Sequence, residues 1–281
     1  MVTALVAGAS GNVGRHVVAG LHAAGAEVRA LTRDPLRVAG LPAAAVRGDL
    51  ADPRSLAAAV DGADAVYLMW PFFTAEPAAA ALDVIGRHAP RVVLLSSGSV
   101  DGNIPAAASI ARFHAEVEHV VEQSTAEWTI LRPAGFAANS LDWADSIRAD
   151  GVVADAFPDA AGAWIHEADI AAVAVHSLLD EGHDRRRYTI TGPQSLTMAE
   201  QAHIIGEVIG RPVHWRTQSR TEALAQLTAD GWPKEYAEVA LRVQEQLAQS
   251  DAEVTSTVAD VTGSAARTYR QWVTDHAHAF R

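Results

Sequence analysis

The chain has 281 residues, no cysteine and a formal charge of −12 at pH 7, and Lys234 is its single lysine. A chain of this length buries roughly three quarters of its unfolded surface, so it needs no disulfide or metal for stability. Without cysteine, disulfides, thiolate nucleophiles and cysteine-ligated zinc are excluded, which agrees with a reducing compartment. The acidic charge and the lack of a basic stripe argue against nucleic-acid binding.

The sequence shows no secretion signal and no membrane-spanning segment. Its first residues are apolar, but no basic region precedes them and glycines soon interrupt them, unlike a secretion signal. No apolar run reaches the ~20 residues of a membrane span. We therefore expect a cytoplasmic protein that does not contact membranes.

The first half of the sequence alternates apolar, strand-like runs with alanine-rich helical stretches. Strands are expected at Val2–Ala7, Glu27–Thr32, Ala44–Arg47, Ala65–Met69, Val92–Ser96 and Thr129–Leu131. Helices are expected between them at Val13–Ala24, Arg54–Val60, Ala75–His88 and Ile110–Gln123. Short buried strands separated by helices predict an α/β fold with a doubly wound parallel sheet of the Rossmann type.

The second half has a different rhythm, which begins after Pro133. Residues 134–163 show no clear period, whereas Glu167–Leu179 predicts a helix and Tyr188–Thr191 a short strand. Helices are expected from Leu196 onward, and two of them begin with capping boxes that satisfy free backbone N–H groups. The two capping boxes and two further helices are Thr197–Glu200, Ser219–Glu222, Tyr236–Ala248 and Ala266–Ala277.

This organisation predicts two parts. The Rossmann-type domain covers residues 1–133, and residues 164–183 pack back onto it. Residues 134–163 and 184–281 form a smaller, mainly helical domain for the substrate. We find no internal repeat and no low-complexity linker, so the two parts are expected to pack directly on each other.

Three glycines lie between the first strand and the first helix, in "VAGASGNVGR". Gly8 allows a sharp turn, Gly11 lets the backbone approach a pyrophosphate, and Gly14 lets the helix pack closely on the sheet. The N–H groups at the start of the helix then face the phosphates. The turn thus predicts a dinucleotide site, whose expected contact residues are Gly8, Ser10, Gly11, Asn12, Val13 and Gly14.

The end of the second strand indicates which dinucleotide is bound. Proteins that bind NAD usually place a carboxylate there, to accept hydrogen bonds from the ribose hydroxyl. Here Thr32 and Arg33 occupy that place, and a guanidinium matches the 2′-phosphate of NADP. Asp34 offers an alternative, because it could take the carboxylate role one residue later. We favour NADP(H) over NAD(H) and expect Arg33 to contact it.

Further cofactor contacts are expected where the third and fourth strands end. Asp49 and Leu50 in "GDLAD" could flank an adenine, although Asp49 could instead cap the next helix. Asp52 fits that cap better. Met69 and Trp70 end the fourth strand at the carboxyl edge, where ligands of such sheets bind.

With these elements in place, the chain resembles the NmrA-like group of atypical short-chain dehydrogenases. The matching pieces include "VAGASGNVG", "LTRDP", "GDLAD", "LLSSGSV", "EADIAAVA" and "TYRQWVTDHAHAF", and they span nearly the whole chain. The resemblance implies an NADP-binding Rossmann domain with a small C-terminal domain that closes over the nicotinamide. Members of the group include quinone and dye reductases, and also cofactor sensors without turnover.

The chain departs from ordinary short-chain dehydrogenases at the catalytic pair. Those enzymes use a Tyr and a Lys four residues apart on the helix after the fifth strand. Here that helix reads "SIARFHAEVEHVVEQS" and contains neither residue. His114 resembles the position where related reductases carry the lysine, so it is the candidate for ribose binding or proton donation. The alternative is a surface pair with Glu118, four residues on.

Other candidate site residues follow the fifth and sixth strands. Ser96 and Ser97 could bond cofactor or substrate, or could simply form a turn. In the resembling proteins the loop after the sixth strand borders the nicotinamide, which implies roles for Pro133 and Phe136. The expected substrate pocket consists of Phe72, Asn139, Trp143 and Trp164, although the two tryptophans could instead pack between the two parts.

His166 lies beside two acids, Glu167 and Asp169. A metal site would need further ligands at suitable spacing, and the sequence offers none, so no metal is expected. Asp169 is expected to anchor its helix to the core.

The function expected from these features is an NADP(H)-dependent reductase. Hydride would pass to a conjugated carbonyl or quinone-like acceptor, including aromatic polyketide-type ketones, without a Tyr–Lys pair. A cofactor-sensing regulator with a protein partner is the alternative, and an isomerase or lyase is a third reading. The expected partner is a small aromatic or conjugated molecule, and the expected state is a monomer or homodimer.

Overall fold

The computed structural model describes residues 1–100, 109–249 and 251–281. Its largest feature is a sheet of parallel strands in the order β3-β2-β1-β4-β5-β6-β9. Connections run in opposite directions from β1, which leaves a crevice at the carboxyl ends of β1 and β4. The strands are β1 (Thr3–Ala7), β2 (Glu27–Thr32), β3 (Ala44–Arg47), β4 (Ala65–Met69), β5 (Arg91–Leu95), β6 (Glu127–Pro133) and β9 (Arg186–Ile190).

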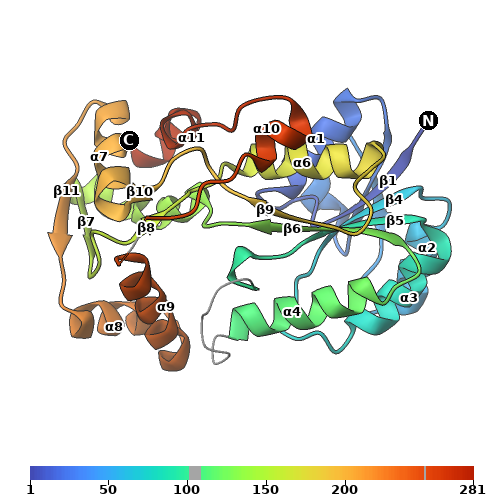
Figure 1. The fold of residues 1–281 in the computed structure, drawn as a ribbon, viewed down its shortest axis with the longest axis horizontal. Coiled ribbons are helices and arrows are strands. Elements are labelled where there is room, and N and C mark those ends of the chain that lie inside the picture. The colour runs from blue at the N-terminus through green and yellow to red at the C-terminus, as the bar shows by residue number, and fades with distance from the viewer. Residues whose placement is uncertain (101–108, 250) are drawn as a thin grey trace.

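Helices cover both faces of this sheet (Figure 1). One face carries α1 (Gly14–Ala23), α6 (Glu167–Leu179) and α10 (Thr257–Thr262), and the other carries α2 (Pro53–Val60), α3 (Ala78–His88) and α4 (Ser109–Glu122). The side chains of β4 alternate between the two faces, and both faces are apolar. Val66 and Leu68 join the core under α2–α4, while Ala65 and Tyr67 join the core under α1 and α6. The predicted doubly wound fold is confirmed.

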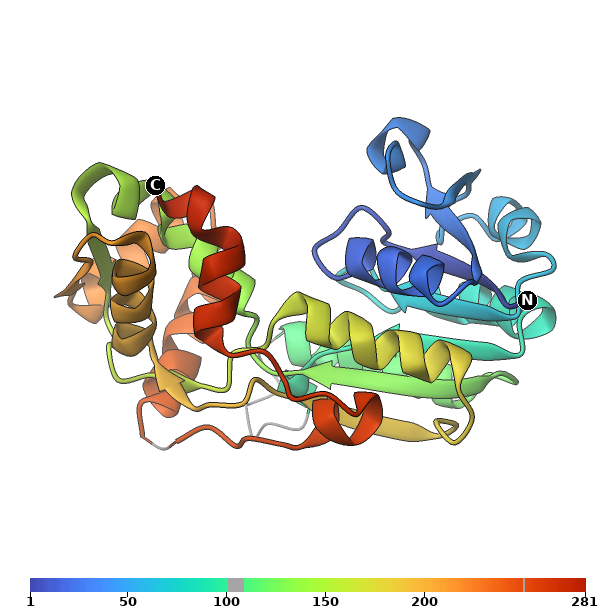
Figure 2. The ribbon, with the colours of Figure 1, turned by 90° about the horizontal axis from the view of Figure 1, so that it is seen from above.

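The smaller part lies beside the carboxyl edge of the sheet (Figure 2). Its strands pair two by two: β7 (Val152–Asp155) with β11 (His214–Thr217), and β8 (Ala161–Gly162) with β10 (Leu196–Thr197). Its helical elements are η3 (Ala137–Trp143), α5 (Ala144–Asp150), α7 (Met198–Ile209), α8 (Arg220–Ala229), α9 (Lys234–Leu247), α11 (Tyr269–His276) and η4 (Ala277–Phe280). Both expected capping boxes are present, at the starts of α7 and α8.

Two elements from the second half of the chain return to the larger part. β9 pairs with β6 and forms the edge of the main sheet, and α10 packs on α6 and β9. Both lie within residues 184–281, which the sequence assigns to the smaller domain. The division of the chain into domains therefore stays a proposal, with β9 and α10 as segments that pack on the sheet.

Within the described ranges, no helix combines the length and the apolar character needed to cross a membrane.

Candidate functional site

The turn between β1 and α1 is built around its glycines. Gly8 has φ +84°, a left-handed conformation that disfavours other residues, and a Cβ there would lie 2.8 Å from Met69 Cε. A Cβ at Gly14 would lie 2.0 Å from the Gly8 carbonyl oxygen. The amide of Gly11 donates to that same oxygen at 2.9 Å. The helix can therefore start directly against the end of the strand only because these positions lack side chains.

At the start of α1, the described residues offer no hydrogen-bond acceptor to the amides of Asn12, Val13 and Gly14. In this described turn no side chain caps the helix, and its first turn contains no acidic residue. Arg15 folds back over the turn, with Nη2 donating to Asn12 Oδ1 at 2.7 Å. Val13 is buried in the core, whereas Ser10 is exposed. Free amides, the helix dipole and a nearby guanidinium together favour an anionic ligand such as a diphosphate.

Arg33 and Asp49 come together from the ends of β2 and β3. Their side chains are 4.0 Å apart from Nη1 to Oδ2, and Arg33 is 76% exposed, so its guanidinium is available to a ligand. Asp34 caps the short helix η1 (Pro35–Val38) and accepts the Leu36 amide at 3.1 Å. Because the Asp34 carboxylate is used in this turn, it is less available to a ligand than the exposed Arg33 guanidinium.

The residues after β3 mostly fix the backbone at this edge of the sheet. Asp52 caps α2, as expected, and accepts the Arg54 amide at 3.1 Å. Asp49 Oδ1 accepts the Ala51 amide at 2.9 Å, which fixes the carboxylate in the loop after β3. Leu50 is buried in the core under α2 and α3.

An aromatic cluster follows β4. Trp70 is buried and donates through Nε1 to the Thr74 carbonyl at 2.9 Å, and its ring meets Phe72 edge-on at 5.2 Å. Phe73, 78% exposed, contacts the ring of Phe113 on α4 at 5.8 Å. These rings place an apolar wall at the carboxyl edge, beside α4. Phe72 lies in this wall, apart from the other three residues expected in the substrate pocket.

Ser96 belongs to a buried polar network that sequence reasoning missed. Its hydroxyl donates to Glu118 on α4, and Arg132 on β6 donates to the same carboxylate, with Nη2 2.5 Å from Oε2. Glu118 is only 2% exposed. The network ties α4 to the ends of β5 and β6. The available signal was a pair of charges, Glu118 within an apolar helix face and Arg132 within an apolar strand.

His114 does not pair with Glu118, which is bound elsewhere. Its ring packs on Phe113, with centroids 4.1 Å apart, and its Nδ1 is buried without a hydrogen-bond partner among the described residues. Burial lowers the pKa of His114 to about 4. The imidazole is therefore neutral at pH 7 and can donate or accept a hydrogen bond, but it holds no extra proton.

β6 ends at Pro133, which pairs with Ile190 of β9, and the loop follows directly. Phe136 then forms a bridge with Ile165 and packs partly on the core under α1 and α6. The short helix η2 (Gly98–Val100) approaches this loop, because a Cβ at Gly98 would lie 2.9 Å from the Pro133 oxygen. Ser97 bonds within its own turn, to Ser99 at 2.9 Å.

A cavity of about 640 Å³ opens in the smaller part, next to this loop. Asn139, Trp143 and Trp164 all line it, which brings together three of the four expected substrate-pocket residues. Trp164 connects the cavity to the sheet edge, since its ring fills the space over Gly135, where a Cβ would lie 2.5 Å from Cζ3. Its Nε1 donates to the Leu196 carbonyl at 2.8 Å. Sequence reasoning missed Asp155, Arg216 and Trp232, which line the same cavity and come from separate elements.

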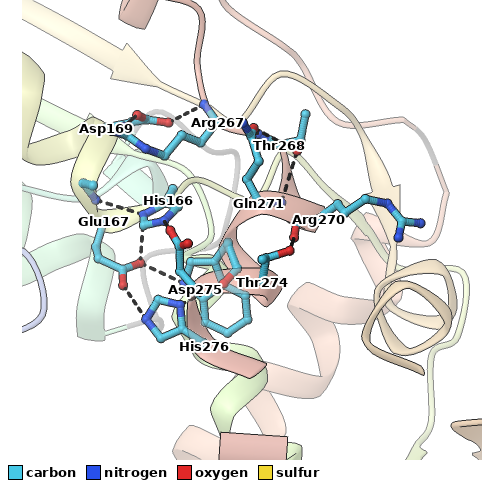
Figure 3. Close-up of polar contacts among 12 residues, drawn as sticks. His166, Glu167, Asp169, Arg267, Thr268, Arg270, Gln271, Thr274, Asp275 and His276 are labelled. Carbon is cyan, nitrogen blue, oxygen red and sulfur yellow. Dashed lines mark hydrogen bonds and ion pairs between the residues drawn. The ribbon is translucent and has the colours of Figure 1, made fainter. Parts of the chain in front are cut away.

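His166 and Glu167 join α6 to α11 through polar contacts (Figure 3). No group of three or more His, Asp or Glu side chains in the described part of the chain is placed to bind an ion. Glu167 Oε2 accepts Trp272 Nε1–H at 2.9 Å, and its Oε1 is 3.0 Å from His276 Nε2. Figure 3 also shows His166 reaching Asp275, at 3.3 Å.

Asp169 anchors its helix to Arg267 and not, as the sequence had led us to expect, to the core. Its carboxylate accepts the Arg267 amide at 2.6 Å and also the Arg267 guanidinium (Figure 3). Arg267 lies in the segment between α10 and α11. These contacts fasten the smaller part to the sheet.

The fold and the glycine turn define an NAD(P)-binding α/β protein. The profile of the NAD(P)H-binding family matches residues 8–181, and the chain belongs to this family. Among characterised relatives, a (4-alkanoyl-5-oxo-2,5-dihydrofuran-3-yl)methyl phosphate reductase of Streptomyces griseus is 38% identical over 98% of both chains. An NAD(P)H azoreductase of Xenophilus azovorans is 34% identical, also over 98% of both.

Solved structures show the same fold. The quinone oxidoreductase of Escherichia coli complexed with NADPH has a TM-score of 0.83 and 20% identity, over 97% of this chain and 99% of that one. The Citrobacter triphenylmethane reductase complexed with NADP(H) has a TM-score of 0.81 and 19% identity, over 98% and 99%. The resemblance to NmrA-like atypical short-chain dehydrogenases is confirmed.

Proposed function

We propose that this protein is an NADP(H)-dependent reductase that passes hydride to a conjugated carbonyl or quinone-like acceptor. The observation that carries the proposal is the position of the cavity. Trp164 lines the cavity and packs on Gly135, just after β6, and β6 ends at the same sheet edge as the glycine turn. An acceptor in the cavity and a dinucleotide on the turn would therefore meet at one edge.

The shape of the glycine turn agrees with the binding of a nicotinamide dinucleotide. A Cβ would collide with a neighbour at Gly8 and at Gly14, and the amides at the start of α1 are uncapped. In our proposal the amides of this turn hold the diphosphate, with Met69 beside the turn, and Arg33 holds the 2′-phosphate, with Asp49 beside it. The cofactor would supply the hydride when bound.

The chain's own residues would then orient the acceptor and exclude water. Phe136 and Trp164 give the loop after β6 an apolar surface, and Ser97 offers a hydroxyl beside it. We assign His114 a neutral hydrogen-bond role, since burial keeps its pKa low. The helix α4 carries no Tyr or Lys. A conjugated acceptor suits such a site, because its product spreads the developing negative charge and needs no strong acid at the oxygen.

Steady-state oxidation of NADPH with a panel of quinones and enones tests the proposal. We expect turnover with conjugated acceptors and none with simple aliphatic ketones. Tight cofactor binding without turnover of any acceptor would contradict it. In that case a cofactor-sensing role becomes the better explanation, and a pull-down with and without NADP⁺ would look for the partner.

A further inference from the structure

The cavity of the smaller part carries more negative than positive side chains. Three carboxylates line it, from Asp142 in η3, Asp155 in β7 and Asp230 at the end of α8. One guanidinium, Arg216 of β11, is the only basic group among its lining residues. The charges come from four separate elements and therefore do not belong to one helix face.

Asp155 shows that this negative charge is built into the wall. Its Oδ1 accepts the Ala156 amide at 2.6 Å, and its Oδ2 accepts Gln244 Nε2 at 3.2 Å, from α9. Burial raises the pKa of Asp155 and also that of Asp142. Burial raises these pKa values because it disfavours the charged carboxylate, and a positively charged ligand would favour that charged form.

Arg216 does not neutralise these carboxylates. Among the described residues it forms no ion pair with them within 4 Å; it is exposed on β11, where its charge acts on Glu222. A doubly charged phosphate in the cavity would meet one guanidinium and three carboxylates. At separations of 6–8 Å in a partly wet site, each extra like charge weakens binding roughly fivefold to tenfold.

The remaining walls are aromatic and apolar. Trp143, Trp164 and Trp232 line the cavity together with Leu227 and Leu247. Trp232 is 44% exposed, which is unusual for so large an apolar side chain and places an accessible ring at the cavity. Indole faces attract cations as well as flat rings.

We infer that the acceptor reduced here is a flat aromatic molecule that carries a protonated amine and no phosphate or sulfonate. This inference rests on the proposed reductase function and narrows its substrate class. It also separates this chain from the 38% identical relative, whose name specifies a phosphate ester. The amine would lie toward Asp142 and Asp155, and the ring between the tryptophans.

Three naphthoquinones that differ in one substituent test the inference. The substituent is an aminomethyl, a neutral methoxymethyl or a sulfonatomethyl group at the same ring position. We expect kcat/KM for the cationic quinone to exceed that for the anionic one about tenfold or more at low salt, and the difference to shrink with added salt. Equal values, or a preference for the sulfonate, would overturn the inference.

Variants assign the preference to the cavity. Asp142→Asn should lower the cation-to-anion ratio about fivefold, and Arg216→Gln should raise it. Asp145→Asn is the matched control, since Asp145 is exposed on the neighbouring α5 and outside the cavity lining, and it should leave the ratio unchanged. Asp155→Asn is read together with the KM for NADPH, which reports whether the variant is folded.

The outcomes separate the two proposals. If the neutral quinone is not reduced at all, the proposed function fails. If it is reduced but Asp142→Asn leaves the ratio unaltered, only the charge inference fails. A sulfonate preference that Arg216→Gln abolishes would instead make Arg216 an anion site.

Discussion

Arg33 is the residue on which the choice of cofactor depends. We predict that Arg33→Glu weakens NADP⁺ binding by about 10- to 100-fold, because it removes charge-assisted hydrogen bonds and adds repulsion. NAD⁺ binding should change by less than about threefold. Isothermal titration calorimetry with both nucleotides measures this, with Arg87→Glu on α3 as a control of equal charge change. Equal losses for both nucleotides would mean that Arg33 does not discriminate.

His114 should make the protein sensitive to acid. Its pKa is about 4 when folded and about 6.5 when unfolded, so the unfolded state binds more protons between these values. The stabilising effect is complete above pH 6.5 and is lost as the pH falls toward 4, at most about 3 kcal/mol. We predict that His114→Gln flattens this part of a urea-unfolding profile, while His119→Gln, exposed on the same helix, does not.

At the scale of elements, the junction between β1 and α1 leaves no room for a side chain. We predict that Gly14→Ala costs more than about 3 kcal/mol and abolishes cofactor binding, because its Cβ would lie 2.0 Å from a backbone oxygen. Gly20→Ala is the control on the same helix. Its Cβ would meet a methyl group of Val175 at 2.9 Å, which a rotation can relieve. Urea unfolding and fluorescence titration with NADPH measure both effects.

The α6–α11 junction contains a buried hydrogen bond from one indole N–H. Trp272 is fully buried and donates to Glu167, which is 3% exposed, so Trp272→Phe leaves a buried carboxylate short of a donor. We predict a loss of about 2–4 kcal/mol in the free energy of unfolding. Thr274→Val on the same helix should change it by less than about 0.5 kcal/mol. A loss no larger than that of the control would show that the junction is held elsewhere.

Sequence patterns predicted β1 to β6 because these strands are mostly apolar runs separated by helical stretches. β9 was harder to place, since Arg186 and Arg187 make it resemble a surface segment, and an edge strand buries only part of its surface. The short pairs β7–β11 and β8–β10 join residues far apart in the chain. Their partners, and not their own sequences, make them strands.

The sequence likewise predicts one part of the candidate site and not the other. The glycine turn and Arg33 are local patterns, so the sequence alone indicates them. The Ser96–Glu118–Arg132 network and the acidic cavity wall draw one residue from each of several elements. A charged residue within an apolar pattern indicates a buried charge, but only the tertiary structure shows which residue binds to it.

For the whole molecule, the path of the chain predicts joint unfolding. The chain leaves the sheet after β6, returns as α6 and β9, leaves again, and returns as α10 before ending in α11 and η4 (Figures 1 and 2). We predict one calorimetric transition, which NADPH at 100 times its Kd raises by about 5–10 °C, from about 2.7 kcal/mol of binding. Two separated transitions, of which NADPH moves only one, would contradict this.

The packing around Trp164 limits how the enzyme can be redesigned. Glycine at 135 and 162 leaves space for the indole ring, because a Cβ at either would lie within 2.6 Å of it, and a Cβ at Gly192 would lie 2.1 Å from the Trp164 backbone oxygen. A smaller residue at 164 would open a void, and a larger residue at Gly135 or Gly162 would displace the ring. Directed evolution toward new acceptors should therefore accumulate its substitutions in α8 and α9, on the far wall, and leave these four positions untouched.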